Sequence, residues 1–448
     1  MVERIVLENG ARLLLERIPE VRSASLGLWV ATGSRDEAED EAGFAHFVEH
    51  MMFKGTKRRT ARDIATAFDR LGGQVNAMTT KEYTAYYAKV LDRFVFDAFR
   101  LLYEMLTESV YAPEEIEKEK NVILEEMSMV EDTPDDVVHD LAAQVVYGDH
   151  PLGRPVLGRP EAVAGLSREA LLDFVDRTYT PERLIVTVAG RFADDTVDAI
   201  RAAVGALPPQ SGASEANPGA AMTDARRMNA RARFAAHRAV RDEDGRACAS
   251  PPAYVGGELR KTREDLEQAH VVYVYPGLAY DHADIFAMAV LNNIVGGSMS
   301  SRLFQTVRED EGLVYNIYSY HTAHRDSGYF AVYAGMRPEN AVRVYEHVIK
   351  ELARLARGEI RAEELEAAKM QLVAGTLFAL ESTGARMSRM ARNELYLGRH
   401  PGIDDVQRWI EAVTVDDVVR LATALFHRPL GTARIEPPLS AERPSGKP

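Results

Sequence analysis

Near the N-terminus the sequence reads Gly43-Phe44-Ala45-His46-Phe47-Val48-Glu49-His50, and this stretch decides the fold and function that we expect. His46 and His50 are four residues apart, so on a helix of about 3.6 residues per turn their imidazoles lie one above the other and can bind one metal ion. Glu49 lies on the same side, where its carboxylate can accept a proton from a water molecule at that metal. An ordinary amphipathic helix with two satisfied histidines is the alternative.

A second helix is predicted at 113–131, and it offers a third ligand. A catalytic zinc site takes three protein ligands and leaves one position open, and with one cysteine in the chain a carboxylate is the natural third ligand. Glu119 and Glu126 are two turns apart and share a face with Ile123, whereas Glu125 points elsewhere. A charge on such a face is costly unless a metal or a partner compensates it, which favours Glu126 as a ligand. A solvated acidic helix remains the alternative.

The two halves of the chain resemble each other, which indicates a duplicated domain. Two pairs of segments correspond at nearly the same offset: 112–117 with 362–366, and Ser167 with Thr414. In the second half, Ala368 and Gly375 take the places of Glu119 and Glu126. The duplicated fold therefore does not require these carboxylates, which makes a chemical role for them more probable.

Composition predicts a two-domain protein without nucleic-acid or membrane partners. A chain of 448 residues with 46% hydrophobic content can bury two cores, and its net charge of −14 disfavours nucleic-acid binding. Residues 1–20 read as a hairpin that turns at Asn9-Gly10 rather than as a signal peptide, and no apolar run reaches the length of a membrane span. We expect a cytoplasmic protein, or one of an organelle matrix if an import sequence has been removed.

The composition also predicts where the domains end. We expect an N-terminal zinc-binding domain at 1–207, a linker at 208–255, a metal-free C-terminal domain at 256–440 and a tail at 441–448. The linker begins with Pro, Gly, Ala and Ser and continues into an arginine-rich segment at 222–241. A docking or membrane-surface role is conceivable for this segment, but its few apolar residues favour a solvated linker helix.

Both halves mix strands with longer helices in runs that do not strictly alternate. The expected strands lie at 24–30, 83–90, 184–188, 270–275, 315–319, 329–335 and 431–435. The expected helices lie at 42–53, 61–71, 94–109, 113–131, 167–178, 282–294, 300–310, 339–355, 361–380, 382–397 and 415–425. The pattern predicts an α+β fold of two homologous, two-layer α/β-sandwich domains.

Several separated motifs are spread over nearly the whole chain. They are the stretch 43–56; Gly72 to Ala77 with Thr79, Glu82, Thr84 and Tyr86; the pair Glu119 and Glu126; and 301–305 with Arg308-Glu309, Gly312-Leu313 and Tyr315. Together they make the chain resemble the pitrilysin and insulin-degrading enzyme family of zinc peptidases (inverzincins), in the short branch that includes mitochondrial processing peptidase and bacterial relatives.

The resemblance implies a role for each matching residue of the zinc site. His46, His50 and Glu126 match the ligands of one Zn²⁺ per chain, Glu49 matches the general base, and Glu119 matches the acidic residue that supports the site. The implied activity is that of a zinc metalloendopeptidase acting on extended peptides or on targeting and leader sequences. A non-catalytic or partner-dependent subunit of a processing-peptidase-like complex is the alternative.

The resemblance also implies how a substrate is held. Asn76 and Ala77 match an edge strand that pairs with the substrate backbone, and Arg308 and Tyr315 match an Arg/Tyr pair of the metal-free domain. From the residues alone, Arg308 would be a surface ion-pair residue and Tyr315 a half-buried strand tyrosine. The family implies a clamshell with a large enclosed chamber, and because this chain has both the zinc set and the Arg/Tyr pair, it implies a homodimer in which the C-terminal domain of one chain completes the site of the other.

Overall fold

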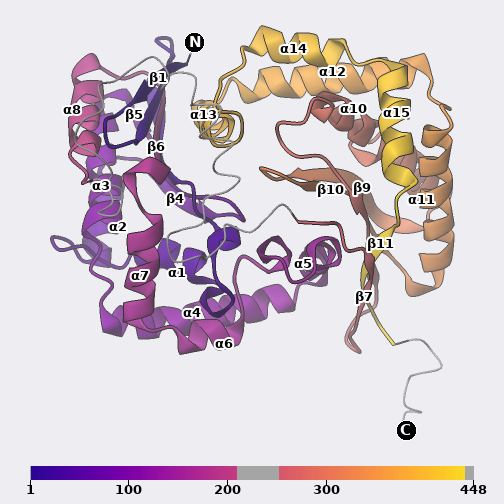
Figure 1. The fold of residues 1–448 in the computed structure, drawn as a ribbon, viewed down its shortest axis with the longest axis horizontal. Helices are drawn as coiled ribbons and strands as arrows, with labels where there is room; N and C mark the ends of the chain where they lie inside the picture. Colours follow the sequence, from indigo (N-terminus) through magenta and orange to yellow (C-terminus); the bar gives the residue numbers. More distant parts are fainter. Residues whose placement is uncertain (1, 209–251, 439–448) are drawn as a thin grey trace, which may run out of the picture. The chain divides into compact units, whose positions relative to one another are not determined.

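A computed structural model describes residues 2–208 and 252–438, which form two compact units (Figure 1). Of these described residues, the N-terminal unit comprises 2–127, 155–208 and 379–400, and the C-terminal unit comprises 128–154, 252–378 and 401–438. The arginine-rich segment at 222–241 and the tail at 441–448 lie outside the described residues. Mixed helices and sheets in two duplicated domains confirm the expected fold class.

The N-terminal unit is built on a six-stranded sheet. In spatial order its strands are β1 (Glu3–Val6), β2 (Arg12–Arg17), β6 (Leu184–Gly190), β3 (Ser23–Val30), β5 (Thr84–Leu91) and β4 (Gln74–Thr79). Strands β2 and β6 run parallel, and the other neighbours run antiparallel. The expected N-terminal hairpin is confirmed as β1–β2, with Gly10 in its turn at a φ of 88°. Strand β4 forms one edge of the sheet.

Helices cover both faces of this sheet, so the unit has a helix layer on each side of the sheet and not only the two layers that we expect. One face packs on a core to which α1 (Phe44–Met51), α3 (Val95–Glu108), α4 (Pro113–Glu131), α7 (Arg168–Thr178) and α8 (Asp194–Gly205) contribute; α2 (Ala61–Arg70) and α6 (Pro160–Gly165) complete the unit. The other face packs on α13 (Thr383–Leu397), where Met387 and Met390 share one buried cluster with Trp29 and Leu14. Because both faces of the sheet are covered, its strands carry apolar residues on both sides. Leu13 and Leu14, for example, are neighbours in β2 and belong to the cores on opposite faces.

The C-terminal unit repeats this plan with five strands. In spatial order they are β7 (Gly257–Thr262), β11 (Gly431–Glu436), β8 (Ala269–Pro276), β10 (Gly328–Met336) and β9 (Val314–Ala323). Its helices are α10 (Ile285–Gly296), α11 (Ala341–Ala356), α12 (Ala362–Ala379), α14 (Ile403–Glu411) and α15 (Val415–Phe426), with a π-helical segment at Phe304–Asp310. The second face of the sheet packs on α5 (Pro134–Tyr147).

Each half of the sequence therefore supplies one helix to the unit formed mainly by the other half. Helix α5 comes from the N-terminal half and α13 from the C-terminal half. Sequence patterns predict no helix between 131 and 167, yet Pro134 opens α5 there, because proline is tolerated in the first turn, where its missing N–H has no helical partner. Within 2–208 and 252–438, no helix combines the length and the apolar composition needed to cross a membrane.

Candidate metal centre

The first half of the predicted site lies on α1, whose N-terminus is fixed by a buried carboxylate. Gly43 precedes the helix at a φ of 103°, and Glu37 accepts hydrogen bonds from the backbone N–H groups of Gly43 (2.9 Å) and Ala45 (2.8 Å). Burial raises the pKa of Glu37 to about 8, although both N–H groups act to lower it. An acidic side chain is favourable at this end of a helix, since the first N–H groups have no helical partners.

The amphipathic pattern of α1 orients the predicted ligands. Phe44, Phe47, Val48 and Met51 are buried in the core of the unit. Residues 46, 49 and 50 occupy the remaining side of the helix, as the helical period requires. Apolar packing on one side thus directs both imidazoles and the Glu49 carboxylate to the other.

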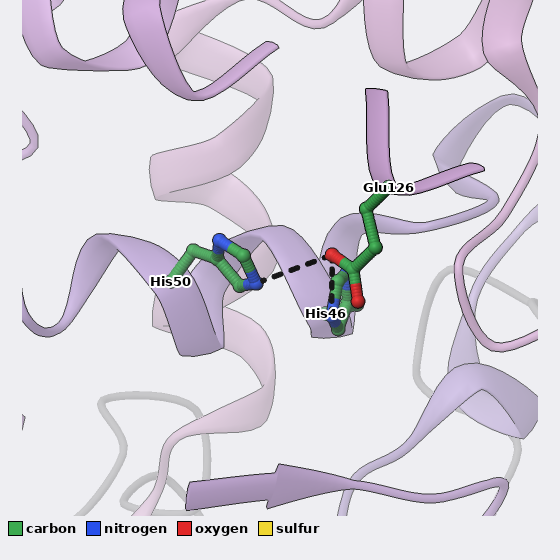
Figure 2. A group of neighbouring side chains, drawn as sticks. All are labelled: His46, His50 and Glu126. Carbon is green, nitrogen blue, oxygen red and sulfur yellow. Dashed lines mark ion pairs between the residues drawn. The ribbon is translucent and has the colours of Figure 1, made fainter. Parts of the chain in front are cut away.

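Helix α4 brings Glu126 to the two histidines, as Figure 2 shows. The same carboxylate atom, Oε2, lies 3.8 Å from His46 Nε2 and 3.7 Å from His50 Nε2. One ligand atom from each of the three residues lies within 4.8 Å of the other two. The structure therefore assembles the three side chains that the sequence analysis selected as ligands.

The protonation of these groups fits a divalent cation at their centre. His50 Nδ1 lies 3.0 Å from Glu119 Oε2, and since an ionised carboxylate only accepts, Nδ1–H donates this hydrogen bond; Nε2 is the ring nitrogen that faces Glu126. Burial, with a smaller effect of His50, lowers the pKa of His46 to about 4, which keeps that imidazole neutral. Two imidazole nitrogens and one carboxylate oxygen form the donor set of a three-ligand catalytic zinc site.

Glu119 supports this arrangement from a buried position, and only 3% of its surface is exposed. Besides His50 it contacts Lys54, whose Nζ lies 2.5 Å from Oε1. Burial alone would raise the pKa of Glu119, but the hydrogen bonds from His50 and Lys54 lower it below its ordinary value. Glu119 is thus an ionised acceptor for the His50 ring. Glu125, on the same helix, is exposed, as the sequence predicts for a residue that points away from the site.

Glu49 is held by a residue to which the sequence analysis gave no role. Thr79 Oγ1 donates a hydrogen bond to Glu49 Oε2 at 2.5 Å. Burial raises the pKa of Glu49, while the hydrogen bond from Thr79 acts in the opposite direction. Thr79 belongs to one of the motifs that carry the family resemblance, and that membership was the only signal available before the contact was visible.

The predicted substrate strand is β4, which ends at Thr79. Asn76 and Ala77 pair with Tyr87 and Tyr86 of β5 and lie at the edge of the sheet. An edge strand leaves alternate backbone N–H and C=O groups available to another extended chain. The hydroxyl of Thr79, the last residue of β4, therefore links this edge strand to Glu49, the predicted base.

The Arg/Tyr pair lies in the C-terminal unit, with Tyr315 exposed and Arg308 half-buried. Arg308 is in the π-helical segment, with its guanidinium 4.7 Å from the centre of the Phe304 ring and 3.8 Å from the Glu309 carboxylate. Tyr315 is 77% exposed and lies at a shift in the register of β9 against β10. The half-buried strand tyrosine is therefore not what the structure shows. Such β-bulges commonly redirect a side chain out of the sheet.

Comparisons with known proteins identify the family to which the chain is similar. Residues 12–160 match the model of the insulinase family, peptidase family M16, and residues 165–372 match the model of the peptidase M16 inactive domain. An uncharacterised zinc protease of Bacillus subtilis is 39% identical and covers 98% of both chains. One from Streptomyces coelicolor is 40% identical over 95% of this chain and 88% of its own.

Solved structures show the same fold at lower sequence identity. A protease from Helicobacter pylori superimposes with a TM-score of 0.82 at 21% identity, covering 98% of this chain and 99% of that one. A peptidase M16 inactive domain from Pseudomonas fluorescens gives a TM-score of 0.83 at 20% identity, covering 98% of both chains.

Proposed function

The chain belongs to peptidase family M16, the insulinase family, and on this basis we propose that it is a zinc-dependent endopeptidase that hydrolyses extended, unfolded peptides, including targeting or leader sequences. Zinc is its cofactor, as in the relatives that are named zinc proteases. The observation that carries the proposal is the convergence of His46, His50 and Glu126 beside Glu49, a carboxylate on the same side of α1.

In the proposed mechanism, His46, His50 and Glu126 would hold the zinc. When bound, zinc supplies Lewis acidity, which polarises a peptide carbonyl and makes a nearby water molecule more acidic. Glu49 accepts the proton of that water and later delivers it to the leaving amine, and burial, which raises the pKa of Glu49, makes its carboxylate a stronger base than an exposed one. The Thr79 hydroxyl holds Oε2, which leaves Oε1 of Glu49 for the water.

Substrate binding at β4 would select extended chains. A peptide that adds to the edge beside Asn76 and Ala77 is recognised through its backbone, so conformation matters more than sequence. A folded protein has few unpaired extended segments to offer, whereas an unfolded peptide or a leader sequence has many. This supports unfolded peptides as the substrate class.

The C-terminal unit would complete the site, and we propose that it does so in the partner chain of a homodimer. The exposed Tyr315 hydroxyl can donate a hydrogen bond to the oxyanion that forms during hydrolysis, and losing one such donor costs about 2.7–4 kcal/mol in other enzymes. Arg308 offers a guanidinium that can bind the substrate backbone or its carboxylates. The family match of 165–372 to an inactive domain agrees with one zinc set per chain.

A single substitution tests the proposed chemistry. Glu49→Gln should keep zinc but lose at least about a hundredfold in kcat, because general acid–base catalysis typically contributes that much or more. Zinc content and peptide hydrolysis are measured on the same preparation. Substantial turnover by the zinc-loaded variant would exclude Glu49 as the base.

Mixing two inactive variants tests the proposed dimer. If each site combines two chains, Glu49→Gln and Tyr315→Phe chains should together recover about a quarter of wild-type activity, since about half of the dimers are hybrids with one intact site. Mass spectrometry first confirms that subunits exchange. No recovery despite exchange would place Glu49 and Tyr315 of one site in the same chain, and a monomer in solution would exclude the homodimer.

A further inference from the structure

The carboxylate of Glu119 has two oxygens with two different partners. His50 Nδ1 lies 3.0 Å from Oε2, and Lys54 Nζ lies 2.5 Å from Oε1. Glu119 lies on α4, whereas His50 is near the end of α1 and Lys54 follows three residues after that helix ends at Met51. The carboxylate thus bridges an imidazole and an ammonium group that come from the same short stretch of chain.

Lys54 matters because of where Glu119 is buried. A hydrogen bond from one imidazole N–H compensates a buried carboxylate only in part, and an unpaired ion in such a place is strongly destabilising. The Lys54 ammonium supplies the opposite charge, and 30% of its side chain is exposed. Because its Nζ engages Oε1, the other oxygen stays directed at His50.

We propose that Lys54 is a positioning residue for the metal ligand His50 and acts through Glu119. The pair holds the His50 ring so that Nδ1–H donates to Glu119 while Nε2 faces Glu126. Partners of this kind fix the tautomer and orientation of a metal-bound histidine, and their loss typically weakens metal binding about 10–100-fold. The inference rests on the proposed zinc site and adds to it a residue that touches neither zinc nor substrate.

The alternative is that Lys54 only stabilises the contact between α1 and α4. The two roles differ in what they change. Loss of a stabilising contact lowers the resistance of the zinc-free protein to unfolding, whereas loss of a positioning residue lowers its affinity for zinc even when the fold is equally stable. Zinc affinity and zinc-free stability are therefore measured together.

The experiment compares three variants of the full-length chain by competition for zinc with a chromophoric chelator. Lys54→Met should weaken zinc binding about 10–100-fold, and Lys54→Arg, which keeps the positive charge, should restore most of it. Lys118→Met is the matched control, because Lys118 forms an exposed 2.5 Å ion pair with Glu115 on α4, and its loss should leave zinc affinity unchanged. The absorption spectrum of the cobalt-substituted protein reports the ligand geometry independently of activity.

Each outcome decides the proposal. A weaker affinity in Lys54→Met with an unchanged unfolding midpoint of the zinc-free protein, and rescue by arginine, supports it. Wild-type affinity in Lys54→Met overturns it and leaves the zinc site intact. A loss of affinity that matches a loss of zinc-free stability overturns it in favour of the structural role. If the wild-type chain does not bind zinc, the proposed function fails as well.

Discussion

Glu394 makes the attachment of α13 to the N-terminal unit sensitive to acid. Its side chain is fully buried and contacts Arg4 Nη2 at 2.8 Å, Arg12 Nη1 at 3.7 Å and His400 Nε2 at 3.1 Å. Burial alone would raise the pKa of Glu394, but hydrogen bonds from His400 and Arg4 and the charges of both arginines lower it from 4.5 to about 2. The ionised carboxylate therefore stabilises the folded chain.

The size of this effect follows from the lowered pKa. A shift from 4.5 to about 2 corresponds to about 3 kcal/mol, because one pKa unit is worth about 1.4 kcal/mol. Since the folded pKa lies below the unfolded one, this stabilisation is fully present above pH 4.5 and is lost as the pH falls through 2. Glu394→Gln should remove this pH dependence and cost about 3–5 kcal/mol at neutral pH, because it leaves the mostly buried Arg12 guanidinium without its charged partner.

A tryptophan lies where this change can be observed. Trp29 is fully buried in the core that α13 covers, beside Met387 and Met390. The chain has two tryptophans, so in a Trp409→Phe background the fluorescence of Trp29 reports the N-terminal unit alone. Urea unfolding is then followed by that signal between pH 3 and pH 7 for the background and for Glu394→Gln.

A matched control separates this buried carboxylate from an exposed one. Glu117 is 70% exposed and pairs with Lys120 on α4, so Glu117→Gln should change the free energy of unfolding by less than about 1 kcal/mol at every pH. If Glu394→Gln lost stability with falling pH as steeply as the background, the carboxylate would not be the acid-sensitive group and the reasoning would be refuted.

Two further predictions concern the zinc site. Glu126→Gln should weaken zinc binding more than about a hundredfold, beyond the effect of losing a supporting residue, whereas Glu125→Gln should not change it; equal affinities measured by chelator competition would mean that another residue supplies the third ligand. Thr79→Val should lower kcat/KM about tenfold and shift the acidic limb of its pH profile upward, because losing the hydrogen bond raises the pKa of Glu49 further; an unmoved limb in the pH–rate profile would exclude this coupling.

Periodicity and spacing were sufficient for the local parts of the structure. The interval between His46 and His50 placed both rings on one side of a helix, and that between Glu119 and Glu126 placed both carboxylates on the face of the next. These inferences need only the helical period, which a short sequence contains. The structure then brings His46, His50 and Glu126 together, and their roles stay predictions until the variants are measured.

Non-local contacts were beyond sequence reasoning. An apolar stripe shows that α13 has a face to bury, but it does not show that this face covers the sheet of the opposite half of the sequence. The Thr79 contact with Glu49 and the Lys54 contact with Glu119 join residues that are distant along the chain, and neither pair has a fixed spacing. The fold of the whole chain sets these contacts, and the presence of a hydroxyl or an ammonium group in a motif does not predict which residue it contacts.

The central claim, that this chain is a zinc endopeptidase, is tested most directly by one measurement on the purified protein. Zinc per chain is determined together with hydrolysis of a mixture of unfolded peptides, before and after removal of the metal by a chelator. We predict one zinc per chain and cleavage at internal bonds that is lost with the metal and restored by added zinc. Cleavage that persists without zinc, or a zinc-loaded chain that cleaves no peptide, would contradict it.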